Sequence, residues 1–183
     1  ALTGNIGRRR RYRGRIVQVE RLVGDVLEVT CQVEGRWVHR PGQFAFVTFD
    51  RLEGAHPFTL SNADDGSGRL RFAIKALGDY TAALAGRLQV GQPVTVEGPY
   101  GRFDFHRDRA DEHVWVAAGI GATPFLAWLE SLQGQPQAAP KVTLHYCVRN
   151  PQEAVFAKRL RELCAGLPSV TLNIRYTERD GHL

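Results

Sequence analysis

Three short segments have residue types that could bind a phosphate-bearing cofactor. The first, Gly119-Ile120-Gly121-Ala122-Thr123-Pro124, lies between an apolar stretch and an amphipathic stretch. Backbone N–H groups and the helix dipole at such a turn attract anions, and glycine lets a phosphate approach closely. We expect Thr123 to be the helix N-cap and Pro124 to take the first helical position. Because Pro124 replaces the third glycine of the usual dinucleotide pattern, a plain tight turn remains an alternative.

The second segment places Lys75 at the end of an expected strand and Gly78-Asp79-Tyr80-Thr81 at the start of a helix. A cation beside a helix N-terminus is another candidate anion site. The third segment, His56-Pro57-Phe58-Thr59-Leu60-Ser61, contains an aromatic ring and two hydroxyl groups. Its composition alone predicts only a strand, since strand hydroxyls usually serve packing and turns.

Arg149 follows a later expected strand and is a candidate for binding the 2′-phosphate of NADP. We expect no carboxylate at that position to hold a free ribose, which slightly favours NADPH over NADH. A solvent-facing arginine without a ligand is an equal alternative.

Six short strands are expected in the N-terminal half, and they would position the second and third segments. Alternating apolar residues and turn sequences such as Asp64-Asp65-Gly66-Ser67-Gly68 indicate them. Strands at this spacing predict an antiparallel six-stranded barrel, with one short helix over Tyr80 to Leu88. The expected strands are Arg13 to Glu20, Val26 to Val33, Phe44 to Phe49, Phe58 to Ser61, Leu70 to Ala76 and Pro93 to Glu97.

Near residue 110 the pattern changes to alternating strands and helices, which is typical of a doubly wound parallel sheet. Asn150 is expected to cap the second helix, with Pro151 at its first position. The expected elements are the strand Val114 to Ala118, the helix Thr123 to Leu132, the strand Val142 to Val148, the helix Pro151 to Leu167 and the strand Val170 to Tyr176.

The net charge of +5 originates in one short segment. Six of the 24 Lys and Arg residues lie there, and the rest of the chain has 18 basic and 19 acidic residues. The six are Arg8, Arg9, Arg10, Arg11, Arg13 and Arg15. The composition, 43% hydrophobic and 23% charged, excludes disorder and collagen-like or coiled-coil architecture. The uncharged stretch Val114 to Leu129 is shorter than the roughly 20 residues of a membrane span. Three scattered cysteines, Cys31, Cys147 and Cys164, are expected to be buried and free.

Four blocks in this order resemble the ferredoxin-NADP reductase superfamily, most closely its branch of ferric-chelate reductases and NADPH oxidase dehydrogenase domains. Most of the superfamily carries arginine at the position of His56, whereas this branch carries histidine. The resemblance covers nearly all residues from Arg13 onward. The blocks are His56-Pro57-Phe58-Thr59, Gly78-Asp79-Tyr80-Thr81, Gly98-Pro99-Tyr100-Gly101 with Phe103, and Gly119-Ile120-Gly121-Ala122-Thr123-Pro124.

The resemblance implies a basic arm or linker over residues 1–12, an FAD-binding barrel over 13–108 and an NAD(P)-binding domain over 109–183. It implies that Thr59 offers its hydroxyl to the reactive flavin N5 and is the residue closest to the reaction. Phe58 would pack beside the flavin ring or ribityl chain. The residues implied to bind FAD are His56, Pro57, Phe58, Thr59, Ile74, Lys75, Gly78, Tyr80 and Thr81. Those implied to bind NAD(P)H are Gly119, Gly121, Thr123, Pro124 and Arg149, and no metal site is implied.

The resemblance also implies that NADPH or NADH passes a hydride to FAD, which then gives single electrons to haem, a ferric chelate or oxygen. Because the cofactors carry this chemistry, no essential general acid or base is expected. The family domain continues to a Cys-Gly-Pro motif that this sequence does not reach, so we expect a C-terminally incomplete nucleotide domain with little or no turnover by itself.

The start at Ala1 and the lack of methionine indicate a piece of a longer chain. By the resemblance, the full protein would lie at the inner face of the cytoplasmic membrane, with the arginine arm beside a membrane span. A solvated tail is an equal alternative for the arm.

Three other functions remain open at this stage. A soluble reductase could feed an iron–sulfur protein or oxygenase, although no clustered cysteines here would bind such a cluster. A regulatory flavoprotein could sense redox state without turnover. A nucleic-acid-binding barrel could use the arginine arm, although the remaining charge of −1 predicts no basic groove.

Overall fold

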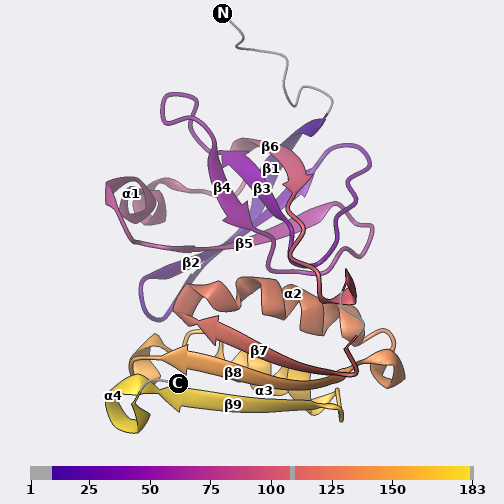
Figure 1. Cartoon of the computed structure of the whole chain (residues 1–183). Helices are drawn as coiled ribbons and strands as arrows, with labels where there is room; N and C mark the ends of the chain where they lie inside the picture. The colour runs from indigo at the N-terminus through magenta and orange to yellow at the C-terminus, as the bar shows by residue number, and fades with distance from the viewer. Residues whose placement is uncertain (1–9, 108–109, 182–183) are drawn as a thin grey trace, which may run out of the picture.

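Six antiparallel strands form a barrel in the N-terminal half of the computed structural model, which describes residues 10–107 and 110–181 (Figure 1). Their order is β4-β3-β6-β1-β2-β5, and a bridge between Leu60 and Phe72 joins the two outer strands. The barrel is therefore nearly closed, as predicted. The strands are β1 (Arg11–Leu22), β2 (Val26–Val33), β3 (Phe44–Thr48), β4 (His56–Thr59), β5 (Arg69–Lys75) and β6 (Pro93–Tyr100).

The barrel core follows from the alternation of side chains along each strand. On β2 every second residue from Leu27 to Val33 is buried, and the intervening positions are only partly buried. Val29 pairs with Phe72 on β5 and with Val19 on β1, so apolar residues from neighbouring strands meet inside. Helix α1 (Asp79–Arg87) follows β5, and its buried Leu84 packs into the same core.

Three parallel strands in the order β7-β8-β9 form the second domain: β7 (Glu112–Ala118), β8 (Lys141–Val148) and β9 (Val170–Tyr176). Two helices, α2 (Thr123–Leu132) and α3 (Ala157–Ala165), contact each other and share one core with this sheet. Figure 1 shows α2 between the sheet and the barrel. The shorter helices are η2 (Phe105–Arg107), η3 (Gly119–Ala122), η4 (Pro136–Ala138), η5 (Pro151–Glu153) and α4 (Thr177–Asp180).

The two domains share apolar packing, because Val26 and Ala73 of the barrel belong to the core of the second domain. The opposite face of the parallel sheet is open at β7, where Val114 is 71% and Val116 is 55% exposed. Within the described residues, β7 is hydrogen-bonded only to β8. No helix in the described part of the chain is long and apolar enough to cross a lipid bilayer.

Two local expectations in this part of the fold were wrong. Strand β1 begins at Arg11, inside the expected arm, because Arg11 pairs along β6 with Glu97; residues 1–9 lie outside the described residues. The helix expected over Pro151 to Leu167 is divided into η5 and α3, and this break lets Phe156 enter the core at 1% exposure. Asn150 is an N-cap and Pro151 takes the first helical position, as predicted, although the helix they begin is η5; the Asn150 side chain accepts a hydrogen bond from the Glu153 N–H.

The expectation for the cysteines is confirmed only in part. Cys31 is fully buried, and burial raises the pKa of its thiol to about 12. Cys147 and Cys164 are free but only half-buried.

Candidate cofactor site

The barrel side of the site joins strand β4 to helix α1 through two stacked rings. The imidazole of His56 lies 3.8 Å from the ring of Tyr80, with an angle of 17° between the planes. The hydroxyl of Tyr80 is buried and has no hydrogen-bond partner in the described structure. Burial and the nearby carboxylates of Glu53 and Asp50 raise the pKa of Tyr80, so it remains a neutral donor. An unpartnered donor here fits an oxygen-rich ligand.

Thr59 ends strand β4, and its backbone pairs with Phe44 on β3. Among the described contacts, its hydroxyl has no hydrogen-bond partner, so the group is available to a ligand. The neighbouring side chain of Phe58 is partly buried and packs against the barrel core beside Phe49 and Phe72. Ile74 is 2% exposed in the same core, which leaves its side chain no surface for a cofactor.

The start of α1 has the donors that a pyrophosphate needs. The first backbone hydrogen bond of this helix runs from Ala82 to the carbonyl of Gly78, so the preceding N–H groups are free of intrahelical partners. Thr81 stabilises the turn: its Oγ1 accepts hydrogen bonds from the N–H groups of Leu77 and Gly78, at 3.0 and 3.2 Å. A Cβ placed on Gly78 would meet no atom within 4 Å. The local chain thus has open space over this turn, and Lys75 ends the preceding strand.

The glycine turn after β7 forms η3, which contacts β5 of the barrel. A Cβ on Gly121 would also meet nothing within 4 Å, and this residue does not have a positive φ. Neither packing nor backbone strain therefore requires glycine here, whereas a phosphate lying on the turn would. Thr123 is not the N-cap that we expected: it is helical and 5% exposed, because η3 runs directly into α2 and Ala122 takes the cap position. Pro124 is the second residue of α2 and not the first as expected, although it still lies in the first turn.

Arg149 has a partner that the sequence did not reveal. Its guanidinium forms an ion pair with Glu153, one turn further along the chain. A carboxylate therefore does stand beside Arg149, contrary to our expectation. Hydrogen bonding to Arg149 lowers the pKa of Glu153, and the nearby Lys75 lowers it further. The barrel approaches η5 here: a Cβ on Gly24, in the turn before β2, would lie 3.7 Å from the Cα of Glu153, and Val26 at the start of β2 pairs with Lys75.

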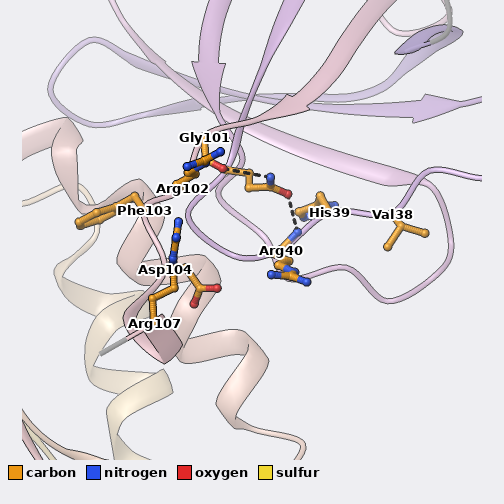
Figure 2. Close-up of a pocket in the computed structure, with 9 residues that line it drawn as sticks. Val38, His39, Arg40, Gly101, Arg102, Phe103, Asp104 and Arg107 are labelled. Carbon is orange, nitrogen blue, oxygen red and sulfur yellow. Dashed lines mark hydrogen bonds between the residues drawn. The ribbon is translucent and has the colours of Figure 1, made fainter. Parts of the chain in front are cut away.

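The block Gly98-Pro99-Tyr100-Gly101 lies at the end of β6, where Tyr100 pairs with Phe44, the residue of β3 with which Thr59 also pairs. Its last residue lines a separate pocket at the domain junction, formed by residues 38–43 and 101–107 (Figure 2). A network of charged side chains also joins the two domains, and it consists of Glu28, Arg71, Glu130 and Arg159. Sequence reasoning found neither feature, because no spacing or period connects their residues.

The residues at the junction fit FAD and a nicotinamide nucleotide. Lys75, the free N–H groups at the start of α1 and the Tyr80 hydroxyl suit a pyrophosphate and its neighbouring hydroxyl groups. The open turn of η3 suits a second phosphate-bearing ligand. A barrel with a flavin-type anion site, packed on a parallel sheet with a glycine turn, defines the class of flavin-dependent reductases.

Comparison with known proteins agrees with this class. Residues 11–104 match a family model described as an FAD-binding domain, and the chain belongs to that family. Residues 11–104 comprise half of the chain, and the rest folds as a parallel-sheet domain after the barrel.

Two relatives and one solved structure illustrate the similarity. The ferredoxin–NAD(+) reductase component of the alkene monooxygenase system of Xanthobacter autotrophicus is 29% identical over 168 residues, which are 91% of this chain and 51% of that protein. Respiratory burst oxidase homolog protein E of Arabidopsis thaliana is 29% identical over 152 residues, 68% of this chain and 16% of that protein. The FAD/NAD-binding domain of nitric oxide dioxygenase from Vibrio cholerae superposes with a TM-score of 0.79 at 22% identity, covering 90% of this chain and 73% of that one.

The chain spans about half or less of the curated relatives that it matches, with 38% to 51% of their length covered among three of them.

Proposed function

We propose that this chain is the flavin and nucleotide-binding part of an NAD(P)H-dependent electron-transfer protein. The observation that carries the proposal is the closeness of the two anion sites. Turn η3 contacts β5, and the turn at Gly24, beside the end of β5 that carries Lys75, lies against Glu153 of η5. A nucleotide on η3 and a flavin along β4 and β5 would therefore meet at the domain junction.

Bound FAD would accept a hydride from NADPH or NADH and release electrons singly. The chain binds and orients the reactants. Lys75 and the N–H groups of α1 hold the pyrophosphate, Tyr80 offers its unpartnered hydroxyl, and Thr59 offers a hydroxyl at the end of β4. No side chain needs to move a proton during hydride transfer, so orientation is the main contribution of the protein.

For the electron acceptor, we propose haem, a ferric chelate or oxygen in a membrane ferric-reductase-like protein at the inner face of the cytoplasmic membrane. His56 in place of arginine and the similarity to a respiratory burst oxidase homolog support this proposal. A second candidate is an oxygenase or iron–sulfur acceptor. The similarity to the reductase component of the alkene monooxygenase system supports it.

The test is stopped-flow spectroscopy of the chain reconstituted with FAD. Because little or no turnover is expected of this chain by itself, bleaching of the bound flavin by NADPH or NADH should be slow, and comparing the two rates measures the nucleotide preference. Reoxidation by ferric citrate, oxygen or a ferredoxin then separates the acceptors. Failure to bind FAD would contradict the proposal, and a chain that binds FAD without being reduced would match a regulatory flavoprotein.

A further inference from the structure

A pocket of about 470 Å³ lies at the domain junction, and none of the residues expected to bind FAD or NAD(P)H lines it (Figure 2). We call it the arginine pocket. Residues 38–43 of the barrel form one wall, and residues 101–107 between the domains form the other. Its lining consists of Val38, His39, Arg40, Gln43, Gly101, Arg102, Phe103, Asp104 and Arg107.

The two walls are fixed to each other by hydrogen bonds and packing. The side chain of Gln43 accepts a hydrogen bond of 2.8 Å from the Arg40 N–H and donates one of 3.2 Å to the Gly101 carbonyl. The Phe103 ring packs on Trp128 of α2, with 4.6 Å between the ring centres. His39 is buried, and its ring contacts Trp37 and the Asn62 carbonyl, each at 3.0 Å. The pocket is therefore preformed.

The charge in the pocket is unbalanced. Three guanidinium groups, those of Arg40, Arg102 and Arg107, line it, and no carboxylate of the described residues pairs with any of them. The single acidic residue in the lining, Asp104, is hydrogen-bonded to the His106 ring at 2.8 Å. By contrast, Arg11 and Arg71 elsewhere in the barrel are paired with carboxylates. Figure 2 shows Arg40 on one side of the space and Arg102 and Arg107 on the other.

We propose that the arginine pocket binds a small anion with several carboxylate or phosphate groups. Guanidinium groups bind both kinds of anion through paired hydrogen bonds, and three of them around one space require a ligand with more than one anionic group. The volume corresponds to a small molecule. The ligand is separate from the cofactors, because Lys75, Gly78 and Gly121 belong to other parts of the junction. This inference does not depend on the proposed reductase activity.

Isothermal titration of the FAD-saturated chain tests the proposal, with citrate in one arm and inorganic pyrophosphate in the other, at constant ionic strength. Whichever of the two anions binds identifies the kind of anionic group that the pocket prefers. Arg102→Gln and Arg107→Gln should each weaken binding by about tenfold or more, the effect of losing a charge-assisted hydrogen-bonded pair. Arg161→Gln is the matched control: it removes the same charge from an exposed position on α3 and should leave the affinity unchanged.

Three results would overturn the proposal. The first is that the wild-type chain binds neither anion. The second is that the control variant loses as much affinity as the pocket variants, which would indicate nonspecific attraction. The third is anion binding by the FAD-free chain that is absent from the FAD-saturated chain, which would assign the binding to the cofactor site. Far-ultraviolet circular dichroism of the variants checks that they are folded.

Discussion

Arg159 on α3 donates a hydrogen bond of 3.1 Å to Glu28 on β2, joining two residues that are 131 positions apart. The same guanidinium pairs with Glu130 on α2, and Arg71 on β5 donates to Glu130 at 2.9 Å. These four side chains are 14% to 28% exposed and have alternating charge. They connect the barrel to both helices of the second domain, and so they set where the glycine turn lies relative to β4 and β5.

Arg159→Met should destabilise the fold more than Glu130→Gln. Burial raises the pKa of both Glu28 and Glu130, more than the neighbouring arginine lowers it. Removing Arg159 leaves two buried carboxylates with one arginine, at a cost of about 2 to 4 kcal/mol in the free energy of unfolding. Glu130→Gln also removes one of the unfavourable charges, so its free energy of unfolding should fall by only about 1 to 2 kcal/mol. Urea unfolding measures both values, and a larger loss for Glu130→Gln would contradict the prediction.

The loss in Arg159→Met should grow with pH. A carboxyl group with a raised pKa in the folded state contributes stability below its unfolded pKa, usually 4.5, and loses that contribution as pH rises through the folded value. Without Arg159, the folded pKa values of Glu28 and Glu130 should rise further. The difference from wild type should therefore be small at about pH 5 and large at about pH 8. The same urea titrations at both pH values check this, and an equal loss at both would disprove it.

Gly42→Ala should strongly destabilise the domain junction. This glycine has a φ of +88°, and a Cβ here would lie 1.9 Å from the Phe103 carbonyl oxygen and 2.8 Å from Nε1 of Trp128. Backbone strain and steric overlap together should lower the free energy of unfolding by about 3 kcal/mol or more. Gly54→Ala is the control, because Gly54 has a φ of +80° but nothing within 4 Å, so only about 1 kcal/mol of strain is expected. Similar unfolding free energies for the two variants would refute the overlap.

The sequence predicted the elements of this fold well, because each has a local signal. Alternating apolar residues located all six barrel strands, and the strand, glycine turn and Pro124 located the start of α2. The errors occurred where tertiary contacts prevail over local patterns. Phe156 breaks a continuous helix by entering the core, and Thr123 loses its capping role because η3 precedes α2 directly.

The interdomain network and the arginine pocket could not be predicted from sequence patterns. Arg40 and Arg102 come from loops without regular structure. They line the same pocket because the neighbouring strands β3 and β6 pair in the barrel. The ion pair of Arg149 with Glu153 has the i, i+4 spacing of a helix, but these residues lie on either side of the start of η5, so no continuous helix indicates it. The candidate ligand-binding residues have local motifs, whereas the residues that fix the domains come together only in the fold.

Gly121→Ala should weaken nucleotide binding without changing stability. The added methyl group meets no protein atom within 4 Å and requires no unusual φ, so the melting temperature should stay the same. The methyl group would, however, occupy the space that a phosphate needs above the turn, and a tenfold or greater loss of NADPH affinity is expected, about 1.4 kcal/mol. Equilibrium dialysis measures it, and Gly134→Ala, outside the site, is the control. A lower melting temperature in Gly121→Ala would indicate a packing role instead.

Thr59→Ala should change the flavin potential while the fold keeps its stability. The hydroxyl has no partner among the described residues, so its removal should alter the unfolding free energy by less than about 0.5 kcal/mol. A hydrogen bond from Thr59 to bound flavin is worth about 1 kcal/mol, which for a two-electron couple corresponds to a shift of about 20 mV. Spectroelectrochemical titration measures the shift. Thr59→Ser keeps a hydroxyl group and should have the wild-type potential. An unchanged potential in Thr59→Ala would show that Thr59 does not hydrogen-bond to the flavin.

Glu153→Gln should increase the preference for NADPH over NADH. Glu153 holds the exposed guanidinium of Arg149, and in the wild-type chain a 2′-phosphate must compete with this carboxylate. The glutamine variant leaves Arg149 free to bind the phosphate, whereas NADH gains nothing from the change. Since Arg149 is solvent-exposed, the ratio of NADPH to NADH affinity should rise by only about two- to fivefold. Titration with both nucleotides measures the ratio, and Glu162→Gln on the exposed face of α3 is the charge-matched control. An unchanged ratio in Glu153→Gln would show that Arg149 lies outside the nucleotide site.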